Sequence, residues 1–258
     1  MRVFRTAFSL LCGVVLLATL APPAEAATPR LRLTCGMVIN RDAEIYLARD
    51  LYCPDFAVRV EQDHSGYVLP PRVRVDLRGH TLRGNGTGRG ITAFSGGSDV
   101  TTVEVVNGRL KNWDVAVGGD YEFRTRNLAL VGNRVGFFCG GFGCIADRTY
   151  FEGNSSTGFN VGGDAGGTVT RSTFVRNKVG AAVSFIWSLS IDHSTFRKND
   201  VGVLASGARV SVARTLFVKN RTAVQVVNEV GDDYPCANLS RVVFVKNRVG
   251  LDGPRCVA

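Results

Sequence analysis

The chain repeats a short pattern in which an apolar residue precedes an asparagine by two or three positions. The asparagines of this pattern, spaced 21 to 27 residues apart, are Asn112, Asn133, Asn154, Asn177, Asn199, Asn220 and Asn247. In five of the repeats the apolar residue is a phenylalanine, namely Phe151, Phe174, Phe196, Phe217 and Phe244. A recurring period of this length is typical of proteins built from stacked repeats.

Each repeat contains short runs of alternating apolar and polar residues, bounded by Gly, Asn and Ser. Such runs predict strands and turns, and helical periodicity is absent after the first 27 residues. A unit of three strands and three turns is one coil of a parallel β-helix. We therefore predict an all-β fold, a single-stranded right-handed parallel β-helix. With coils of about 22 residues it has about ten of them, and at a strand spacing of ~4.8 Å the rod is ~45 Å long.

The repeated phenylalanines and asparagines have structural explanations. Aromatic rings at one position of every coil are expected to point inward and stack on one another. An asparagine at a turn tolerates left-handed backbone, so we expect the repeated asparagines to adopt it. Their amides are also expected to hydrogen-bond from coil to coil as a ladder. Both columns are therefore interpreted as structural and not catalytic.

Residues 1–27 are predicted to be a signal peptide, and residues 28–258 the β-helix domain. Arg2 and Arg5 precede an apolar stretch that ends at Leu20, and Ala24-Glu25-Ala26 is a cleavage site of the small-x-small type. The apolar stretch is too short to cross a bilayer, and no later stretch is long enough. We expect a secreted, extracellular, bacterial protein with no membrane span.

Six cysteines follow the predicted signal peptide, and they form three pairs that are close in sequence. An even number in an exported chain favours disulfide bonds, because zinc-type spacing and histidine clusters are absent. The expected pairs are Cys35–Cys53, Cys139–Cys144 and Cys236–Cys256. The first and last pairs are expected to staple the two ends of the rod, where strand edges are open.

The early coils resemble a known group of proteins. The run from Val75 to Gly84, Val-Asp-Leu-Arg-Gly-His-Thr-Leu-Arg-Gly, and the run Gly88-Arg-Gly-Ile91 resemble the opening coil of right-handed parallel β-helix repeat proteins. That group belongs to the pectate-lyase-like superfamily and includes the NosD-type periplasmic proteins. The resemblance covers residues 33–253 and implies the fold. It leaves the activity open, since this fold serves lyases, hydrolases, epimerases, adhesins and binding proteins.

Resemblance to pectate lyases makes calcium a candidate cofactor, held by carboxylates on one strand face. On the strand after each asparagine we predict this outward column: Val117, Phe138, Asn160, Ala182, Leu204, Gln225 and Asp252. Only Asp252 is a carboxylate, so no acidic ladder supports Ca²⁺ and we expect no cofactor and no metal. Glu229, Asp232 and Asp233 form an acidic cluster in an insertion. We interpret it as a solvated loop, with a cation- or substrate-binding loop as the alternative.

Asp147, Asp192 and His193 are the candidate catalytic residues. Ile191-Asp192-His193 resembles a stretch found in pectate lyases, although the same column in other coils marks it as part of the repeat. Asp147 and Asp192 occupy this column two coils apart, so their axial separation is about 10 Å. That separation is near the one that paired carboxylates have in inverting glycosidases.

Basic residues recur at fixed positions and are expected to form two stripes along the rod. The candidate ligand-binding residues are Arg148, Arg171, Arg214, Arg241, Arg176, Lys198, Lys219 and Lys246. The formal net charge is +9, and removal of the signal peptide would lower it to +8. Stacked like charges repel one another, so the stripes do not stabilise the fold. Solvated basic turns are the alternative to a polyanion-binding surface.

We therefore favour a secreted monomer that binds an acidic polysaccharide or another cell-surface polyanion through its basic stripes. Nucleic acid is excluded as a partner, because stacking aromatic residues do not accompany the stripes. One alternative is a polysaccharide lyase, epimerase or glycoside hydrolase of the pectate-lyase-like superfamily. The other is a structural or adhesive surface module.

Overall fold

The structure is a computed structural model that describes residues 28–61, 71–93, 102–141, 143–162, 166–184, 188–228 and 235–256. The predicted signal peptide, residues 1–27, lies outside this range. So does the acidic cluster of Glu229, Asp232 and Asp233. No helix that could span a membrane is found in the described part of the chain.

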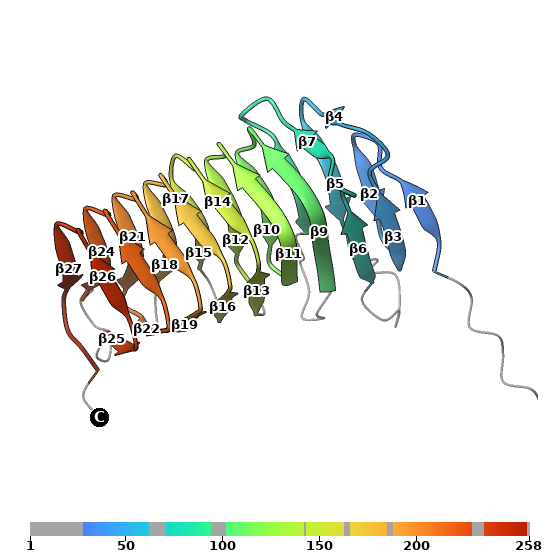
Figure 1. Ribbon diagram of the computed structural model, residues 1–258. Coiled ribbons are helices and arrows are strands. Elements are labelled where there is room, and N and C mark those ends of the chain that lie inside the picture. The colour runs from blue at the N-terminus through green and yellow to red at the C-terminus, as the bar shows by residue number, and fades with distance from the viewer. Residues whose placement is uncertain are drawn as a thin grey trace, which may run out of the picture.

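The described elements are strands that wind into a rod with three faces (Figure 1). Face 1 consists of β1 (Arg30–Arg32), β3 (Ala43–Tyr46), β6 (Arg72–Asp76), the first halves of β9 (Thr102–Lys111) and β11 (Glu122–Val131), β13 (Cys144–Asp147), β16 (Gly167–Thr170), β19 (Ser188–Asp192), β22 (Arg209–Ala213) and β25 (Cys236–Ser240). Face 2 consists of β4 (Leu51–Tyr52), β7 (Thr81–Arg83), the second halves of β9 and β11, β14 (Tyr150–Glu152), β17 (Thr173–Val175), β20 (Thr195–Arg197), β23 (Leu216–Val218) and β26 (Val243–Val245). Face 3 consists of β2 (Met37–Ile39), β5 (Phe56–Val60), β8 (Arg89–Ala93), β10 (Val115–Gly119), β12 (Val135–Cys139), β15 (Thr157–Val161), β18 (Val179–Ser184), β21 (Val201–Ser206), β24 (Thr222–Val227) and β27 (Val249–Asp252).

Every strand pairs in parallel with the equivalent strand of the next coil, so the fold is a parallel β-helix, as predicted. Face 3 is a sheet of ten strands, which confirms the expected ten coils. Faces 1 and 2 form one sheet of 17 strands, because β9 and β11 run without interruption around the corner between them. Parallel pairing of successive coils follows from repeats that cannot bury their apolar residues alone.

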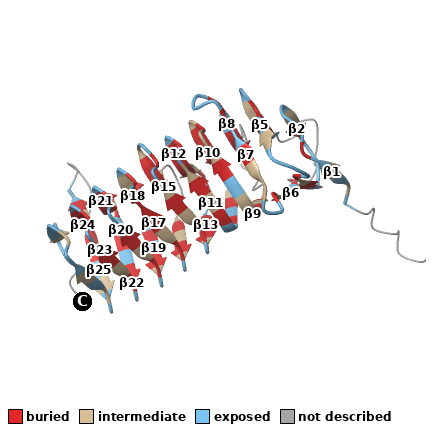
Figure 2. Cartoon of the chain, turned by 45° about the horizontal axis from the view of Figure 1, so that its top comes forward, coloured by how far each residue is buried: buried red, intermediate tan, exposed pale blue. Residues whose placement is uncertain are grey.

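Burial alternates along the strands of face 1, such as β19 and β22, whereas the strands of face 3 are buried over several consecutive residues, and together they enclose a continuous apolar core (Figure 2). The predicted phenylalanine stack is confirmed. Phe151, Phe174 and Phe196 lie with ring centroids 4.4 Å apart and planes within 4°. Phe217 continues the stack, and Phe244 at the last coil is tilted by 31° and only partly buried. Stacking at the coil spacing removes large apolar surfaces from water at every level of the rod.

The predicted asparagine ladder runs from Asn133 to Asn247 at the corner between faces 2 and 3. In each coil the side-chain Oδ1 accepts hydrogen bonds from the backbone N–H and the Nδ2 of the asparagine before it. The Nδ2 also donates to a backbone carbonyl, as Asn177 does to Phe151 at 3.1 Å. The ladder therefore satisfies polar groups that the turn would otherwise leave buried without partners.

Two details of the ladder differ from the sequence prediction. The left-handed backbone belongs to the residue before the ladder asparagine, for example Lys198 with φ 57°, and not to Asn199. The ladder asparagine points inward, so the exposed residue before it makes the turn. In the first repeat Asn112 itself has φ 61°, and Trp113 takes the ladder position, where its N–H donates to Asn133. Leu110 is in register with Leu130, so Trp113 is the equivalent of Asn133, and the sequence prediction placed the ladder position of this coil one residue too early.

A second ladder, of hydroxyl groups, lies at the corner between faces 1 and 2 and was not predicted. The backbone N–H of Thr149 donates to Ser172 Oγ, that of Ser172 to Ser194 Oγ, and that of Ser194 to Thr215 Oγ1. All four residues are buried. The sequence signal was a Ser or Thr two positions before four of the five repeated phenylalanines; Val242 takes this place before Phe244.

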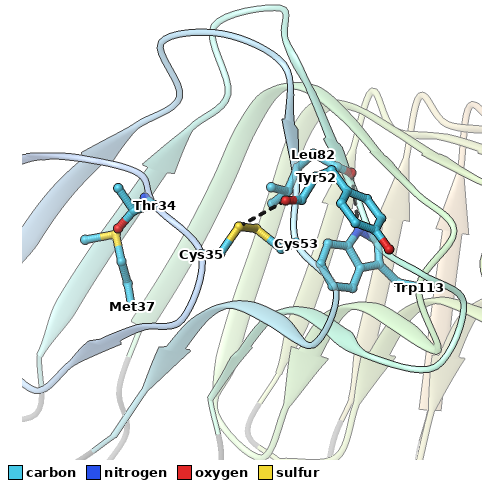
Figure 3. The surroundings of a disulfide bond; sticks show 7 residues. All are labelled: Thr34, Cys35, Met37, Tyr52, Cys53, Leu82 and Trp113. Carbon is cyan, nitrogen blue, oxygen red and sulfur yellow. Dashed lines mark hydrogen bonds between the residues drawn. A yellow bond between two sulfur atoms is a disulfide. The ribbon is translucent and has the colours of Figure 1, made fainter.

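The three expected disulfide bonds are present: Cys35–Cys53, Cys139–Cys144 and Cys236–Cys256. Figure 3 shows the first of them beside Trp113, whose indole N–H donates to the carbonyl of Leu82 at 3.2 Å. Trp113 is fully buried against Gly84, where a Cβ atom would approach its ring to 2.5 Å. The disulfide links the first two coils at the N-terminal end, where strand edges are open, and the indole of Trp113 fills the core of the coils that follow.

Candidate functional site

The corner between faces 2 and 3 carries a column of basic residues that we call the Asn-corner stripe: Arg176, Lys198, Lys219 and Lys246. All four have left-handed backbone, with φ between 52° and 57°, and each lies directly before a ladder asparagine. The backbone N–H groups of Arg176, Lys198 and Lys219 donate to the next coil, and Lys246 occupies the equivalent position in the last coil, so the four residues are in register. The geometry makes each side chain project outward at a level of its own, about 4.8 Å from the next.

The Asn-corner stripe is almost free of acidic partners. Arg176 pairs with Glu152, but Lys198, Lys219 and Lys246 form no ion pair with any described residue. Further unpaired basic residues flank the stripe at the same corner: Lys178, Arg197, Arg221 and Arg248. The one carboxylate among these turns is Asp200. Asp200 forms no ion pair with a described residue, so the C-terminal coils present a net positive field at this corner, opposed only by Glu152 at Arg176 and by the single charge of Asp200.

The corner between faces 1 and 2 carries a second column, the hydroxyl-corner stripe: Arg148, Arg171, His193, Arg214 and Arg241. These residues also have left-handed backbone, with φ between 46° and 54°. Unlike the first stripe, this one is partly neutralised from the coil before. Arg171 donates to Asp147 Oδ1 at 2.6 and 2.8 Å, and Arg214 makes a two-pronged contact with Asp192 at 2.6 and 2.9 Å.

The candidate catalytic residues lie on the outer side of this corner. Strand register places Asp147 and Asp192 in one column, with Thr170 between them. Thr170 donates to Asp147 at 2.9 Å, and the Nδ1 of His193 lies 2.8 Å from Asp192 Oδ2. Both carboxylates therefore make structural contacts to neighbouring coils.

The ion pairs decide the protonation of these carboxylates. The hydrogen bond from Arg214 lowers the pKa of Asp192 to about 2, against a smaller opposing effect of burial and with help from His193. For Asp147, burial raises the pKa, but the hydrogen bonds from Arg171 and Thr170 and the charges of Arg171 and Arg148 lower it overall. Both groups are ionised at neutral pH, which suits anchoring of arginines and not donation of a proton to a leaving group.

A groove of about 590 Å³ crosses face 1 in the N-terminal coils. Its charged lining residues are Asp42, Glu44, Arg72, Arg74, Glu104 and Arg124. Across five successive strands the outward residues in register alternate in charge: Arg30, Glu44, Arg74, Glu104 and Arg124. This alternation was not predicted, because these coils lack the Phe-x-x-Asn pattern on which the repeats were aligned.

Glu104 forms ion pairs with two arginines. Arg74 Nε donates to Glu104 Oε2 at 3.1 Å, and Arg126 lies 3.4 Å from its other oxygen. Glu44, two coils from Glu104, forms no ion pair with any described residue. Beside the groove, the guanidinium of Arg78 lies 4.0 Å from the ring centroid of Tyr46. The groove thus combines carboxylates and guanidiniums, with an aromatic ring next to it, and hydroxyl-rich ligands bind such groups.

The described residues of face 3 bear on the predicted outward column of side chains. The predicted outward column is correct from Phe138 onward, but Gly118, and not the fully buried Val117, is the partner of Phe138. The prediction counted one residue too few in that coil, and a shift of one residue reverses the side of the sheet. No group of three or more metal-ligating side chains occurs among the described residues.

No protein-family model and no curated protein matches the chain. Among solved structures it is similar to the catalytic domain of a GH87 α-1,3-glucanase variant in complex with tetrasaccharides, with a TM-score of 0.33 and 10% identity over 88% of this chain. The chain spans 61% of that domain's length. It is also similar to the A-module of the Azotobacter vinelandii mannuronan C-5 epimerase AlgE4, with a TM-score of 0.28 and 12% identity over 90% of this chain and 91% of that one.

At TM-scores this low the two likenesses carry no weight for function. The strand pairing itself defines the class of protein, a parallel β-helix repeat protein closed by disulfide bonds. The closer resemblance to NosD-type proteins stays a prediction.

Proposed function

We propose that this protein binds an acidic polysaccharide along the Asn-corner stripe. The observation that carries the proposal is the stacking of Lys198, Lys219 and Lys246, which have no described acidic partner, on successive coils. Like charges held about 5 Å apart repel one another, and an extended polyanion would relieve that repulsion. Three disulfide bonds are typical of proteins that work outside the reducing cytoplasm, where such polymers occur.

The hydroxyl-corner stripe contributes less to this function. Asp147 and Asp192 already hold Arg171 and Arg214, so these two arginines are only partly available to a ligand. Arg241 in the last described turn of this corner forms no ion pair with a described residue. The binding surface therefore centres on the Asn corner of the C-terminal coils and extends to Arg241.

Neutralising the three lysines of the Asn-corner stripe should weaken binding of polygalacturonate by roughly 10- to 100-fold at low salt, since each exposed ion pair contributes up to about 1 kcal/mol. The variant is Lys198→Gln, Lys219→Gln and Lys246→Gln combined. Titration of a fluorescent polyuronate measures the affinity, and the difference from the native protein should shrink as salt screens the charges.

The matched control neutralises three exposed arginines of the N-terminal coils that form no described ion pair, Arg41, Arg49 and Arg83, again with glutamine. It changes the net charge equally but leaves the stripe intact, so its affinity should stay within about 3-fold of the native value. If both triple variants bound polygalacturonate equally weakly, the loss of affinity would be due to the lower net charge and not to the stripe. An affinity that does not change with salt concentration would contradict the proposal.

A second candidate function, cleavage or epimerisation of a glycan, is favoured by the face 1 groove. Glu44 and Glu104 lie two coils apart on one face, about 10 Å along the axis, with Arg74 between them. Paired carboxylates near this separation suit inverting hydrolysis. The arrangement differs from that of Asp147 and Asp192, because Glu44 forms no ion pair with an arginine among the described residues.

If the groove is catalytic, Glu104→Gln should lower turnover by roughly 100-fold or more, the usual contribution of a general acid or base. The assay offers uronate polymers and neutral glucans and follows unsaturated uronate absorbance, reducing ends and epimer content. Glu61→Gln, an exposed carboxylate on face 3, is the control and should retain full turnover. If none of the polymers is turned over, the catalytic proposal is contradicted and polysaccharide binding remains as the proposed function.

A further inference from the structure

We infer that a cavity at the C-terminal end of the rod is a binding site for a carboxylate ligand. The cavity has a volume of about 510 Å³ and lies between the start of β22, the end of β24 and the C-terminal tail. Its lining comprises Arg209, Asn228, Pro235, Pro254, Arg255 and the Cys236–Cys256 disulfide. The volume is within the range of ~300–1,000 Å³ that is usual for small-molecule sites.

The chain builds this cavity by folding its tail back over β25. After β27 the chain returns toward β25, as Figure 1 shows at the end of the rod marked C. The N–H of Ala237 donates to Pro254 O and the N–H of Cys256 donates to Ala237 O, both at 3.1 Å. The disulfide between Cys236 and Cys256 then locks the tail in place, with Cα atoms 4.9 Å apart. Arg255 is therefore held by a fixed backbone.

Arg209 reaches the same cavity from face 1. It is the first residue of β22, in register with Cys236 of the next strand. The sequence separates Arg209 from Arg255 by two coils, and only the returning tail brings them to one cavity. Both are exposed, and neither forms an ion pair with a described residue.

The lining defines the chemistry of the ligand. Two guanidiniums at one cavity repel each other, and an anion between them removes that repulsion and accepts their hydrogen bonds. A planar carboxylate matches the fork of a guanidinium better than a spherical anion does. Asn228 adds an amide, while Pro235, Pro254 and the disulfide form apolar walls. The ligand is thus an organic acid whose carbon body packs against those walls.

This inference stands apart from the proposed polysaccharide function. The cavity residues belong to neither stripe nor to the face 1 groove, and they bind a single small acid whether or not a polymer binds elsewhere. The body of the acid could be a sugar or an aromatic ring, and the shared recognised group is the carboxylate. Galacturonate and benzoate therefore serve as the two probes.

Calorimetric titration of the native protein with galacturonate and with benzoate tests the site, with galactose and benzyl alcohol as their uncharged counterparts. We expect at least one of the two acids to bind, and we expect no binding of galactose or benzyl alcohol. Arg209→Gln and Arg255→Gln should each weaken the binding by about 10-fold or more, because each removes a charge-assisted hydrogen bond. Arg83→Gln, which changes an exposed arginine on face 2 without a described ion pair, should bind the acids as the native protein does.

Failure of both acids to bind would overturn the inference, and so would binding that survives unchanged in Arg209→Gln and Arg255→Gln. Melting temperatures of the variants separate loss of the site from loss of the fold. Replacement of Cys236 and Cys256 by serine releases the tail and should abolish binding by a second route. Polygalacturonate affinity of the Arg209→Gln variant should stay near the native value, so the two proposals fail independently.

Discussion

Replacing Asn177 by alanine should lower the free energy of unfolding by about 3–5 kcal/mol, because it leaves several buried polar groups without partners. Asn177 Oδ1 accepts from the backbone N–H of Asn154 at 3.0 Å and from its Nδ2 at 2.8 Å. Its own Nδ2 donates to Phe151 O and to Asn199 Oδ1, each at 3.1 Å. An alanine at this position removes all four hydrogen bonds.

The loss is large because no water replaces the missing amide. Asn154 and Asn177 are 1% and 2% exposed, so the orphaned N–H groups of Asn154 remain in the interior. An unpaired buried donor costs more than the net value of a formed hydrogen bond. Ladder bonds also polarise one another, so the middle of the ladder is the most sensitive place to interrupt it.

Urea denaturation followed by circular dichroism measures this change in the free energy of unfolding. Asn160→Ala is the matched control, since Asn160 lies half-buried on the outer side of face 3 and its side chain makes no described hydrogen bond. That variant should stay within about 0.5 kcal/mol of the native protein. A loss below about 1 kcal/mol for Asn177→Ala would show that the ladder contributes little to stability.

Replacing Phe196 by alanine should destabilise the rod by about 3–5 kcal/mol. Phe196 is fully buried between two stacked rings, 4.4 Å from Phe174 and 4.9 Å from Phe217. Removal of the ring leaves a cavity that the neighbouring strands cannot close, since β17, β20 and β23 are held in register by the ladders on both sides. Each lost ring contact adds about 0.5–1.5 kcal/mol beyond burial.

The same denaturation experiment distinguishes stacking from simple apolar volume. Phe196→Leu fills most of the space and should cost about 1–2 kcal/mol, less than the alanine variant. Phe244→Ala is the positional control, because Phe244 has one described ring neighbour, 5.5 Å away, and is only partly buried. It should cost roughly half as much as Phe196→Ala. Equal losses at Phe196 and Phe244 would show that the stack does not depend on a ring on either side.

The periodic features of the molecule followed from the sequence because each is a local pattern that repeats. The phenylalanine stack and the asparagine ladder recur at a nearly constant period, so the prediction of one coil applied to its neighbours. The disulfide pairs were also predicted, because their cysteines are close in sequence. Where the repeat is irregular, the prediction slipped by one residue: Trp113 replaced an expected ladder asparagine, and Gly118 replaced Val117 on the outer face.

Features that depend on contacts between coils were not predictable in the same way. Whether a basic residue is free or paired depends on the coil before it: Asp147 holds Arg171, whereas Lys198 has no described acidic partner. The sequence prediction placed the two residues in two basic stripes and did not distinguish the stripes by their pairing. Only the stacked structure separates a neutralised corner from a charged one, because ion pairs form across about 22 residues of intervening chain.

By itself the sequence determined the coil, since alternation of apolar residues, turn residues and one repeated asparagine specify a strand–turn unit that must stack to bury its core. The tertiary structure decided what lies on the surface of that stack. The alternating charges of the face 1 groove depend on the register of coils without a visible repeat. The meeting of Arg209 and Arg255 depends on a tail that turns back over the last coil. Local patterns set the backbone, whereas side chains far apart in sequence meet only once the coils are closed and aligned.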